Sequence, residues 1–138
     1  MLSVNEETST PLQSLGFGGF ITAFAIPTVD FGPVPAGKRW VIEYVSAGVG
    51  IDVGSTYRCE IQVRDESDEL NKVKMIHHLH ASELDTQNSI HMIVSTPIKL
   101  IAETGQTVRF ECTINQPQGV GSRSLEVGIT GTEVSISN

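Results

Sequence analysis

The chain has 138 residues, of which 16 are acidic and 9 are Lys or Arg, so its formal net charge is −7. This charge argues against a protein that binds the nucleic-acid backbone, because such proteins need a basic surface. A hydrophobic fraction of 39% is too high for an intrinsically disordered chain, and no run of about 18 apolar residues is present that would span a membrane. The length predicts a single domain.

The N-terminal segment is rich in Ser, Thr and Glu, and we expect residues 1–16 to form a flexible arm. This segment has neither the basic start nor the apolar run of a secretory signal, so we expect a protein that is cytoplasmic or assembled into a particle. Residues 17–138 then form one folded domain.

Beyond the arm, apolar and polar side chains alternate with a period of two, which is the pattern of half-buried antiparallel strands. The pattern is clearest where Val108, Phe110 and Cys112 share one face. Segments rich in Gly, Pro, Asp and Asn separate the predicted strands, which are 20–26, 39–47, 57–64, 72–80, 89–96, 98–103, 107–115, 124–130 and 133–137. Eight or nine short strands without helical periodicity predict an all-β, two-sheet antiparallel sandwich, and we expect a jelly roll.

Some predicted strands are apolar on both faces, although a sandwich strand usually has one polar face. One face of the strand at 39–47 carries Trp40, Ile42 and Tyr44, which we assign to the core. Its opposite face is also apolar, and the same holds for the segments at 20–26 and 98–102. A large exposed apolar surface is unusual on a monomer, so the second face must be covered.

We expect another copy of the chain to provide this cover, because the arm carries few large apolar side chains. The predicted interface residues are Ile21, Ala23, Ala25, Val41 and Val45. Cover by the protein's own arm and loops is the alternative that the sequence leaves open.

All four histidines lie close together in the sequence. His78 and His80 point outward from the strand at 72–80, and His91 points outward from the strand at 89–96. If these strands form the hairpin that their spacing predicts, His91 lies about 5 Å from one of the other two. Three neighbouring imidazoles could bind Zn²⁺ or another divalent metal. Exposed histidines without a ligand are the simpler interpretation, and we expect no cofactor.

Two further features bear on function and on the core. Tyr57, beside a Gly-rich loop, is the best candidate for an exposed aromatic ring that stacks on a sugar, as in lectin-like jelly rolls. Cys59 and Cys112 both fall on inner positions, which favours buried thiols over a disulfide while leaving the bridge possible.

The sequence therefore predicts a non-enzymatic β-sandwich that acts by binding. The first hypothesis is a self-associating structural component of a particle, appendage or surface assembly, with a protein or glycan partner and no nucleic acid. The second is a carbohydrate-binding, lectin-like domain. The third is a metal-dependent jelly-roll enzyme that uses the three outward histidines. Fold class alone does not decide among them.

Overall fold

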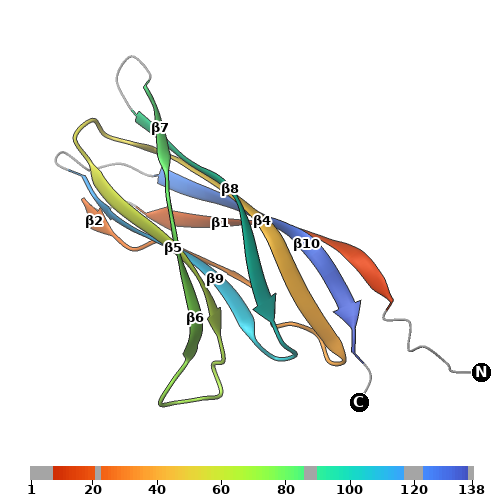
Figure 1. Ribbon diagram of the computed structural model, residues 1–138. Helices are drawn as coiled ribbons and strands as arrows, with labels where there is room; N and C mark the ends of the chain where they lie inside the picture. The colour runs from red at the N-terminus through yellow and green to blue at the C-terminus, as the bar shows by residue number, and fades with distance from the viewer. Residues whose placement is uncertain (1–7, 21–22, 86–89, 117–122, 137–138) are drawn as a thin grey trace, which may run out of the picture.

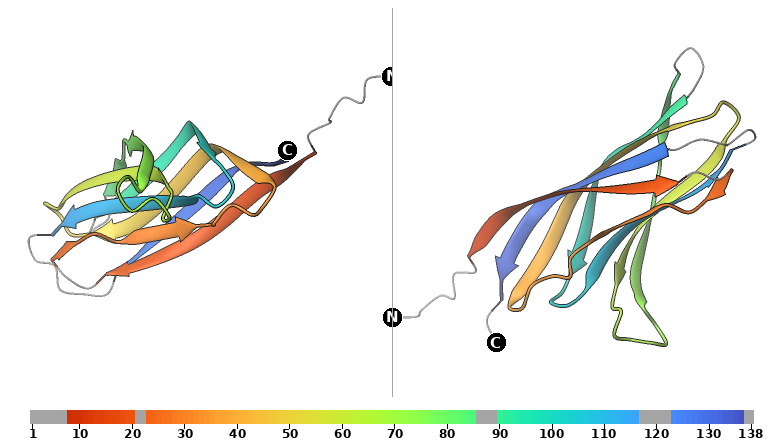
Figure 2. Two further views of the ribbon diagram at one scale, coloured as in Figure 1. Left: turned by 90° about the horizontal axis from the view of Figure 1, so that it is seen from below. Right: turned by 180° about the vertical axis from the view of Figure 1, so that it is seen from behind.

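The computed structural model describes residues 8–20, 23–85, 90–116 and 123–136. The fold is all-β, with 74% strand, no helix in these ranges, and two antiparallel sheets of five strands each. Figures 1 and 2 show the sheets as two layers packed face to face. The predicted β-sandwich is confirmed. No helix long and apolar enough to span a membrane occurs in the described ranges.

Each sheet mixes strands from both ends of the chain. Sheet A has the order β1 (Ser9–Phe20), β10 (Arg123–Ser135), β4 (Lys38–Ile51), β8 (Ile90–Ala102) and β7 (Ser82–Asp85). Sheet B has the order β2 (Phe24–Ala25), β9 (Thr107–Asn115), β5 (Thr56–Arg64) and β6 (Val73–Leu79), with β3 (Thr28–Phe31) also paired to β9. The chain crosses repeatedly between the layers, so most neighbouring strands are distant in sequence, although β5 and β6, and β7 and β8, are consecutive.

The core lies between the sheets and is filled by every second residue of the longer strands. Val108, Phe110 and Cys112 are all fully buried, as their alternation predicted. They meet inner residues of sheet A such as Met92 and Val127. Because both sheets contribute alternating apolar side chains, each strand buries one face in this layer and directs the other outward.

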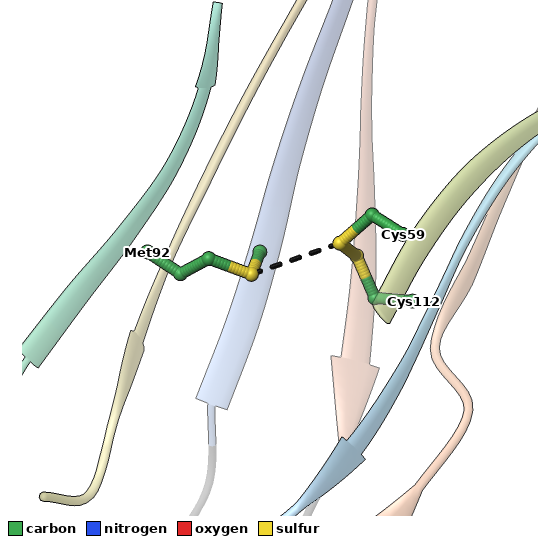
Figure 3. Close-up of a disulfide and its surroundings, with 3 residues drawn as sticks. All are labelled: Cys59, Met92 and Cys112. Carbon is green, nitrogen blue, oxygen red and sulfur yellow. Dashed lines mark hydrogen bonds between the residues drawn. A yellow bond between two sulfur atoms is a disulfide. The ribbon is translucent and has the colours of Figure 1, made fainter. Parts of the chain in front are cut away.

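Cys59 and Cys112 form a disulfide between neighbouring strands, which corrects the expectation of two buried thiols. The pairing of β5 with β9 places these residues directly opposite each other, with 4.2 Å between their Cα atoms. This spacing is that of a non-hydrogen-bonded antiparallel pair, where side chains approach most closely. Met92 Sδ of the opposite sheet lies 3.6 Å from Cys59 Sγ (Figure 3). Spacing along the chain could not reveal this register.

A β-bulge in β4 changes which apolar residues face the core. The pairing with β10 and β8 shifts at Glu43, so that Trp40 and Ile42 point inward but Tyr44 points outward. Val45 is then fully buried. The expectations that Tyr44 belongs to the core and Val45 to a subunit interface were therefore wrong, because one extra residue reverses the alternation.

The first strand also differs from expectation. Residues 9–16, predicted to be part of a flexible arm, form the first part of β1 and pair with β10. The glycines of β1 let it approach β3 closely, because a Cβ on Gly16 would lie 2.4 Å from a methyl carbon of Val29. A Cβ on Gly18 would lie 2.9 Å from the carbonyl oxygen of Thr28. This contact closes one side of the sandwich.

The predicted hairpin between residues 72–80 and 89–96 does not form. β6 pairs with β5 in sheet B, and the short strand β7 intervenes and pairs with β8 in sheet A. The two histidine-bearing strands therefore belong to different layers (Figure 1). Pro97, which divided two predicted strands, lies within the single strand β8, beyond the end of β7. There β8 is an edge strand, where proline is tolerated.

We expect the double variant Cys59→Ala, Cys112→Ala to be less stable than the wild type by about 4 kcal/mol, because the bridge closes a loop of 53 residues. Urea unfolding followed by circular dichroism measures this difference. Unfolding the wild-type protein with and without reductant is the control that leaves the sequence unchanged. A loss below about 1 kcal/mol would show that the bridge does not constrain the unfolded chain as expected.

Candidate interaction face

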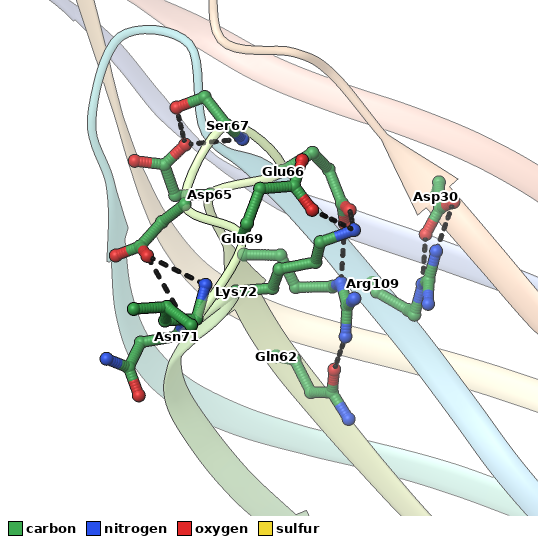
Figure 4. Close-up of polar contacts among 12 residues, drawn as sticks. Asp30, Gln62, Asp65, Glu66, Ser67, Glu69, Asn71, Lys72 and Arg109 are labelled. Atoms are coloured by element: carbon green, nitrogen blue, oxygen red, sulfur yellow. Dashed lines mark hydrogen bonds and ion pairs between the residues drawn. The ribbon is translucent and has the colours of Figure 1, made fainter.

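The outer face of sheet B is charged and internally paired. Arg109 donates to both carboxylate oxygens of Asp30, from Nε at 2.8 Å and from Nη2 at 3.1 Å (Figure 4). Arg64 Nε donates to Glu66 Oε1 at 2.6 Å. These contacts raise the pKa of Arg109, chiefly through the hydrogen bond to Asp30, and lower the pKa of Glu66, chiefly through the hydrogen bond from Arg64. Because its charged side chains pair with each other, such a face is stable when it is exposed to water.

The outer face of sheet A has a different composition. Two rows of residues cross four strands, from Leu15 through Gly128 and Ser46 to Ser95, and from Phe17 through Glu126 and Gly48 to Ile93. Glu126 is the one charged residue in these rows. Together with Tyr44 and His91, these residues are called the sheet A outer face below. Small residues lie in the middle of this face, and large apolar residues lie at its margin.

Leu15 and Phe17 are the most exposed apolar side chains of this face. Their exposed fractions are 66% and 61%, and both project from β1 at outward positions. Tyr44 is exposed because of the bulge at Glu43, and its hydroxyl is hydrogen-bonded to Ser95 Oγ. Side chains of this size are costly to leave in water, so their grouping on one weakly charged face is typical of a contact surface.

The glycine and serine residues of the sheet A outer face create hollows on either side of Leu15. One hollow has a volume of about 360 Å³ and is lined by residues that include Gly48, His91 and Ser95. The other has a volume of about 420 Å³ and is lined by residues that include Gln13 and Thr130. Leu15 therefore stands as a knob between two depressions.

The position of the His91 side chain depends on a small residue of the sheet A outer face. A Cβ on Gly48 would lie 3.2 Å from His91 Nε2, so the glycine leaves room for the imidazole ring above β4. His91 is exposed and borders the hollow at the end opposite Leu15. It presents a polar atom at the margin of a mostly apolar surface.

The predicted interface residues are divided between surface and core. Val41 is half-buried at an outward position of β4, and Ala23 is exposed in the bend before β2. Ala25 and Val45 are buried in the protein's own core, which corrects their assignment to an interface. Ile21 lies outside the described residues. Leu15 and Phe17 were not among the predicted residues, although their alternation with Gly16 and Gly18 is itself a strand pattern.

The strands predicted to be apolar on both faces do leave apolar side chains in water. Phe24 and Ile26 have exposed fractions of 57% and 50%, and Ile101 of 39%. Each of these exposed residues follows or precedes a buried residue, such as Ala25 or Leu100, and so it points to the opposite side of the chain. The described part of the chain therefore does not seal these surfaces by itself.

Tyr57 lies at the end of sheet B and not on the sheet A outer face. Its hydroxyl donates to Glu83 Oε1 at 2.8 Å, which joins β5 to β7. Burial of the ring raises the pKa of Tyr57 to about 12, with smaller contributions from the hydrogen bond to Glu83 and from its charge. Tyr57 borders two hollows, one of about 290 Å³ beside Phe24 and one of about 360 Å³ beside His80.

The three histidines predicted to bind metal are not brought together. His78 lies on the outer side of β6, with Nδ1 3.7 Å from Glu60 Oε2. His80 borders the hollow next to Tyr57, whereas His91 lies in the other sheet. Among the residues that the structure describes, no group of three or more His, Cys, Asp or Glu side chains could hold a metal ion. The prediction depended on the hairpin, which the strand pairing replaces.

Comparison with known proteins adds little. No protein-family model matches the chain, and no curated protein matches it. A solved structure described as "Structure of infectious bursal disease virus Gt strain" matches 96% of this chain with 10% sequence identity and a TM-score of 0.41. The chain covers 41% of the length of that chain. A similarity this weak supports no inference about function, so the geometry of this chain must provide one.

We expect Glu83→Gln to lower the pKa of Tyr57 from about 12 toward 10 without reaching it, because burial, the largest cause of the rise, remains. The measurement is an absorbance titration of the phenolate in a Tyr44→Phe background, which leaves one tyrosine. Because the folded-state pKa is raised, the contribution of Tyr57 to stability is complete below pH 10 and is lost as the pH rises toward 12. An unchanged pKa in the variant would contradict the assigned contact with Glu83.

Proposed function

We propose that this protein is a structural module that self-associates through the sheet A outer face and catalyses no reaction. The observation that carries this proposal is the exposure of Leu15 and Phe17 on a face with few charges, opposite a face on which Arg64 pairs with Glu66 and Arg109 with Asp30. Burial of one such side chain contributes about 1.5–3 kcal/mol to association. The charged outer face of sheet B offers no comparable gain.

The sheet A outer face also supports a second copy of the chain as the partner. It carries a knob, Leu15, and two hollows floored by Gly and Ser residues. In a two-fold symmetric contact the same patch is used by both subunits, so a knob and a hollow on one patch can fill each other. The weak charge of the face is compatible with this arrangement, because like charges would otherwise meet across the axis.

We also propose that the sandwich is a jelly roll. The support is the strand order, in which each sheet interleaves early and late strands, β1 beside β10 and β4 beside β8 in one sheet, β3 beside β9 and β9 beside β5 in the other. Such interleaving is what two Greek keys wound into a double sheet produce.

We expect Phe17→Lys to lower the mass of the protein in solution, because a charge placed on the sheet A outer face opposes its burial. Light scattering coupled to size exclusion measures the mass against the 14.9 kDa of one chain. Phe24→Lys is the matched control, since Phe24 has a similar exposed fraction but belongs to sheet B, and it should leave the mass unchanged. A wild-type protein that is monomeric at micromolar concentration would overturn the proposal.

Glycan binding at Tyr57 is a second candidate function. The aromatic ring lies between two hollows and has Arg58 and Glu83 nearby as polar partners, which is the combination that sugar-binding sites use. We expect a glycan array to detect binding by the wild type that Tyr57→Ala abolishes and Tyr57→Phe retains in part. Equal binding by Tyr57→Ala, or no binding by the wild type, would exclude this site.

A further inference from the structure

β6 is the last strand of sheet B and is exposed along nearly its whole length. Every residue from Val73 to His78 is exposed, and Leu79 is half-buried. Met75 and Ile76 have exposed fractions of 45% and 48%, one on each face of the strand. Within the described ranges β6 pairs only with β5, so its other edge has no strand beside it (Figure 1).

The other sheet edges carry features that discourage pairing with a further strand. The free part of β8 contains Pro97, β7 is four residues long, and β1 is packed closely against β3. The stretch of β6 from Met75 to Leu79 pairs with β5 without a shift in register, and it contains no Pro, Gly, Lys, Arg, Asp or Glu. Natural proteins usually protect an edge with such residues, so an unprotected regular edge indicates a pairing site.

The direction of the backbone groups on this edge follows from the disulfide pair. The 4.2 Å between the Cα atoms of Cys59 and Cys112 marks a pair without hydrogen bonds, so the N–H and C=O of Cys59 point toward β6. The residues of β6 that bond to β5 are therefore those opposite Cys59, Ile61 and Val63, which are Leu79, His77 and Met75. Ile76 and His78, between them, direct their N–H and C=O groups outward.

Building on the proposed self-association, we infer that β6 pairs antiparallel with β6 of a second copy, about a two-fold axis at His77. In this register Ile76 lies opposite His78 of the second copy, and His78 opposite its Ile76. The outward N–H and C=O groups then complete four inter-chain hydrogen bonds, and the two B sheets join into one. This is β-strand addition with a copy of the same chain as the added strand.

The side chains fit this symmetric register. Met75 lies beside Leu79 of the second copy on the inner side, so two thioether–isobutyl contacts form across the axis. No pair of like-charged Lys, Arg, Asp or Glu side chains is created within the five residues, since none of these residue types is present. Lys74, at the end of the stretch, is already paired with Asp68, whose pKa this hydrogen bond lowers. The regular stretch carries no Lys or Arg that would pair with an acidic peptide, which favours a second copy as the partner.

Two contacts on each chain, the sheet A outer face and the β6 edge, give assemblies larger than a dimer. We expect Ile76→Pro to remove the edge contact, because proline lacks the outward N–H, while the bonds of β6 to β5 remain. The mass should fall to about twice 14.9 kDa, and dimerisation through the edge should weaken about tenfold or more. Ile76→Thr keeps the N–H and the branched shape, so it should retain the wild-type mass. A wild-type mass for Ile76→Pro would overturn the inference.

A cross-linking experiment tests the register without relying on proline. In the proposed pairing His77 faces His77 of the second copy as a close, non-hydrogen-bonded pair, the geometry that Cys59 and Cys112 already share. His77→Cys should form an inter-chain disulfide under mild oxidation, whereas His78→Cys, which faces Ile76, should not. Absence of the His77→Cys cross-link, or equal cross-linking by both variants, would contradict the proposed axis.

The two proposals fail in different ways. If the edge contact is wrong and the sheet A contact is right, Phe17→Lys lowers the mass while Ile76→Pro leaves it unchanged and His77→Cys stays uncross-linked. If the sheet A contact is wrong, Phe17→Lys has no effect while Ile76→Pro gives a monomer. If both are right, the combined variant Phe17→Lys, Ile76→Pro has the mass of one chain, 14.9 kDa.

Discussion

The alternation of side chains along the long strands, and its reversal at Glu43 in β4, is the constraint on which the surface of this protein depends. Two sheets can share one dry core only if every long strand directs alternate residues inward. The bulge in β4 buries Val45 and exposes Tyr44, which is then hydrogen-bonded to Ser95 on the outside. The same local irregularity therefore completes the core and creates part of the sheet A outer face.

The two outer faces of the sandwich differ in charge, because their strands have different side chains at outward positions. In sheet B these positions hold Arg and carboxylate side chains that pair with each other, as Asp30 and Arg109 do. In the sheet A outer face they hold Gly, Ser and a few large apolar residues, with Glu126 as the one charged residue of its two rows. A charged, paired face is stable in water, whereas a weakly charged face with knobs and hollows gains free energy when it is buried.

The edges of the sheets provide a second means of association, through the backbone N–H and C=O groups of an edge strand. Glycines permit β1 to pack closely against β3, and Pro97 removes a hydrogen-bond donor from the free part of β8. β6 has neither device, and among the described strands it pairs only with β5, so its outer edge carries backbone groups that no described strand bonds. Apolar surface and open backbone edges act independently, because the first is non-directional and the second fixes register and orientation. A module with both can associate in more than one direction, which is what an extended or closed assembly requires.

The sequence by itself determined the fold class, the strand at 107–115 to the residue, and the presence of more apolar surface than one core can bury. Alternation is a local property, so the residues alone reveal it. Only the tertiary structure decided which face each apolar residue occupies, that Cys59 meets Cys112, and that the histidines separate into different layers. Those outcomes depend on register, on one bulge and on which distant strands become neighbours, and none of these is encoded in the spacing of residues along the chain.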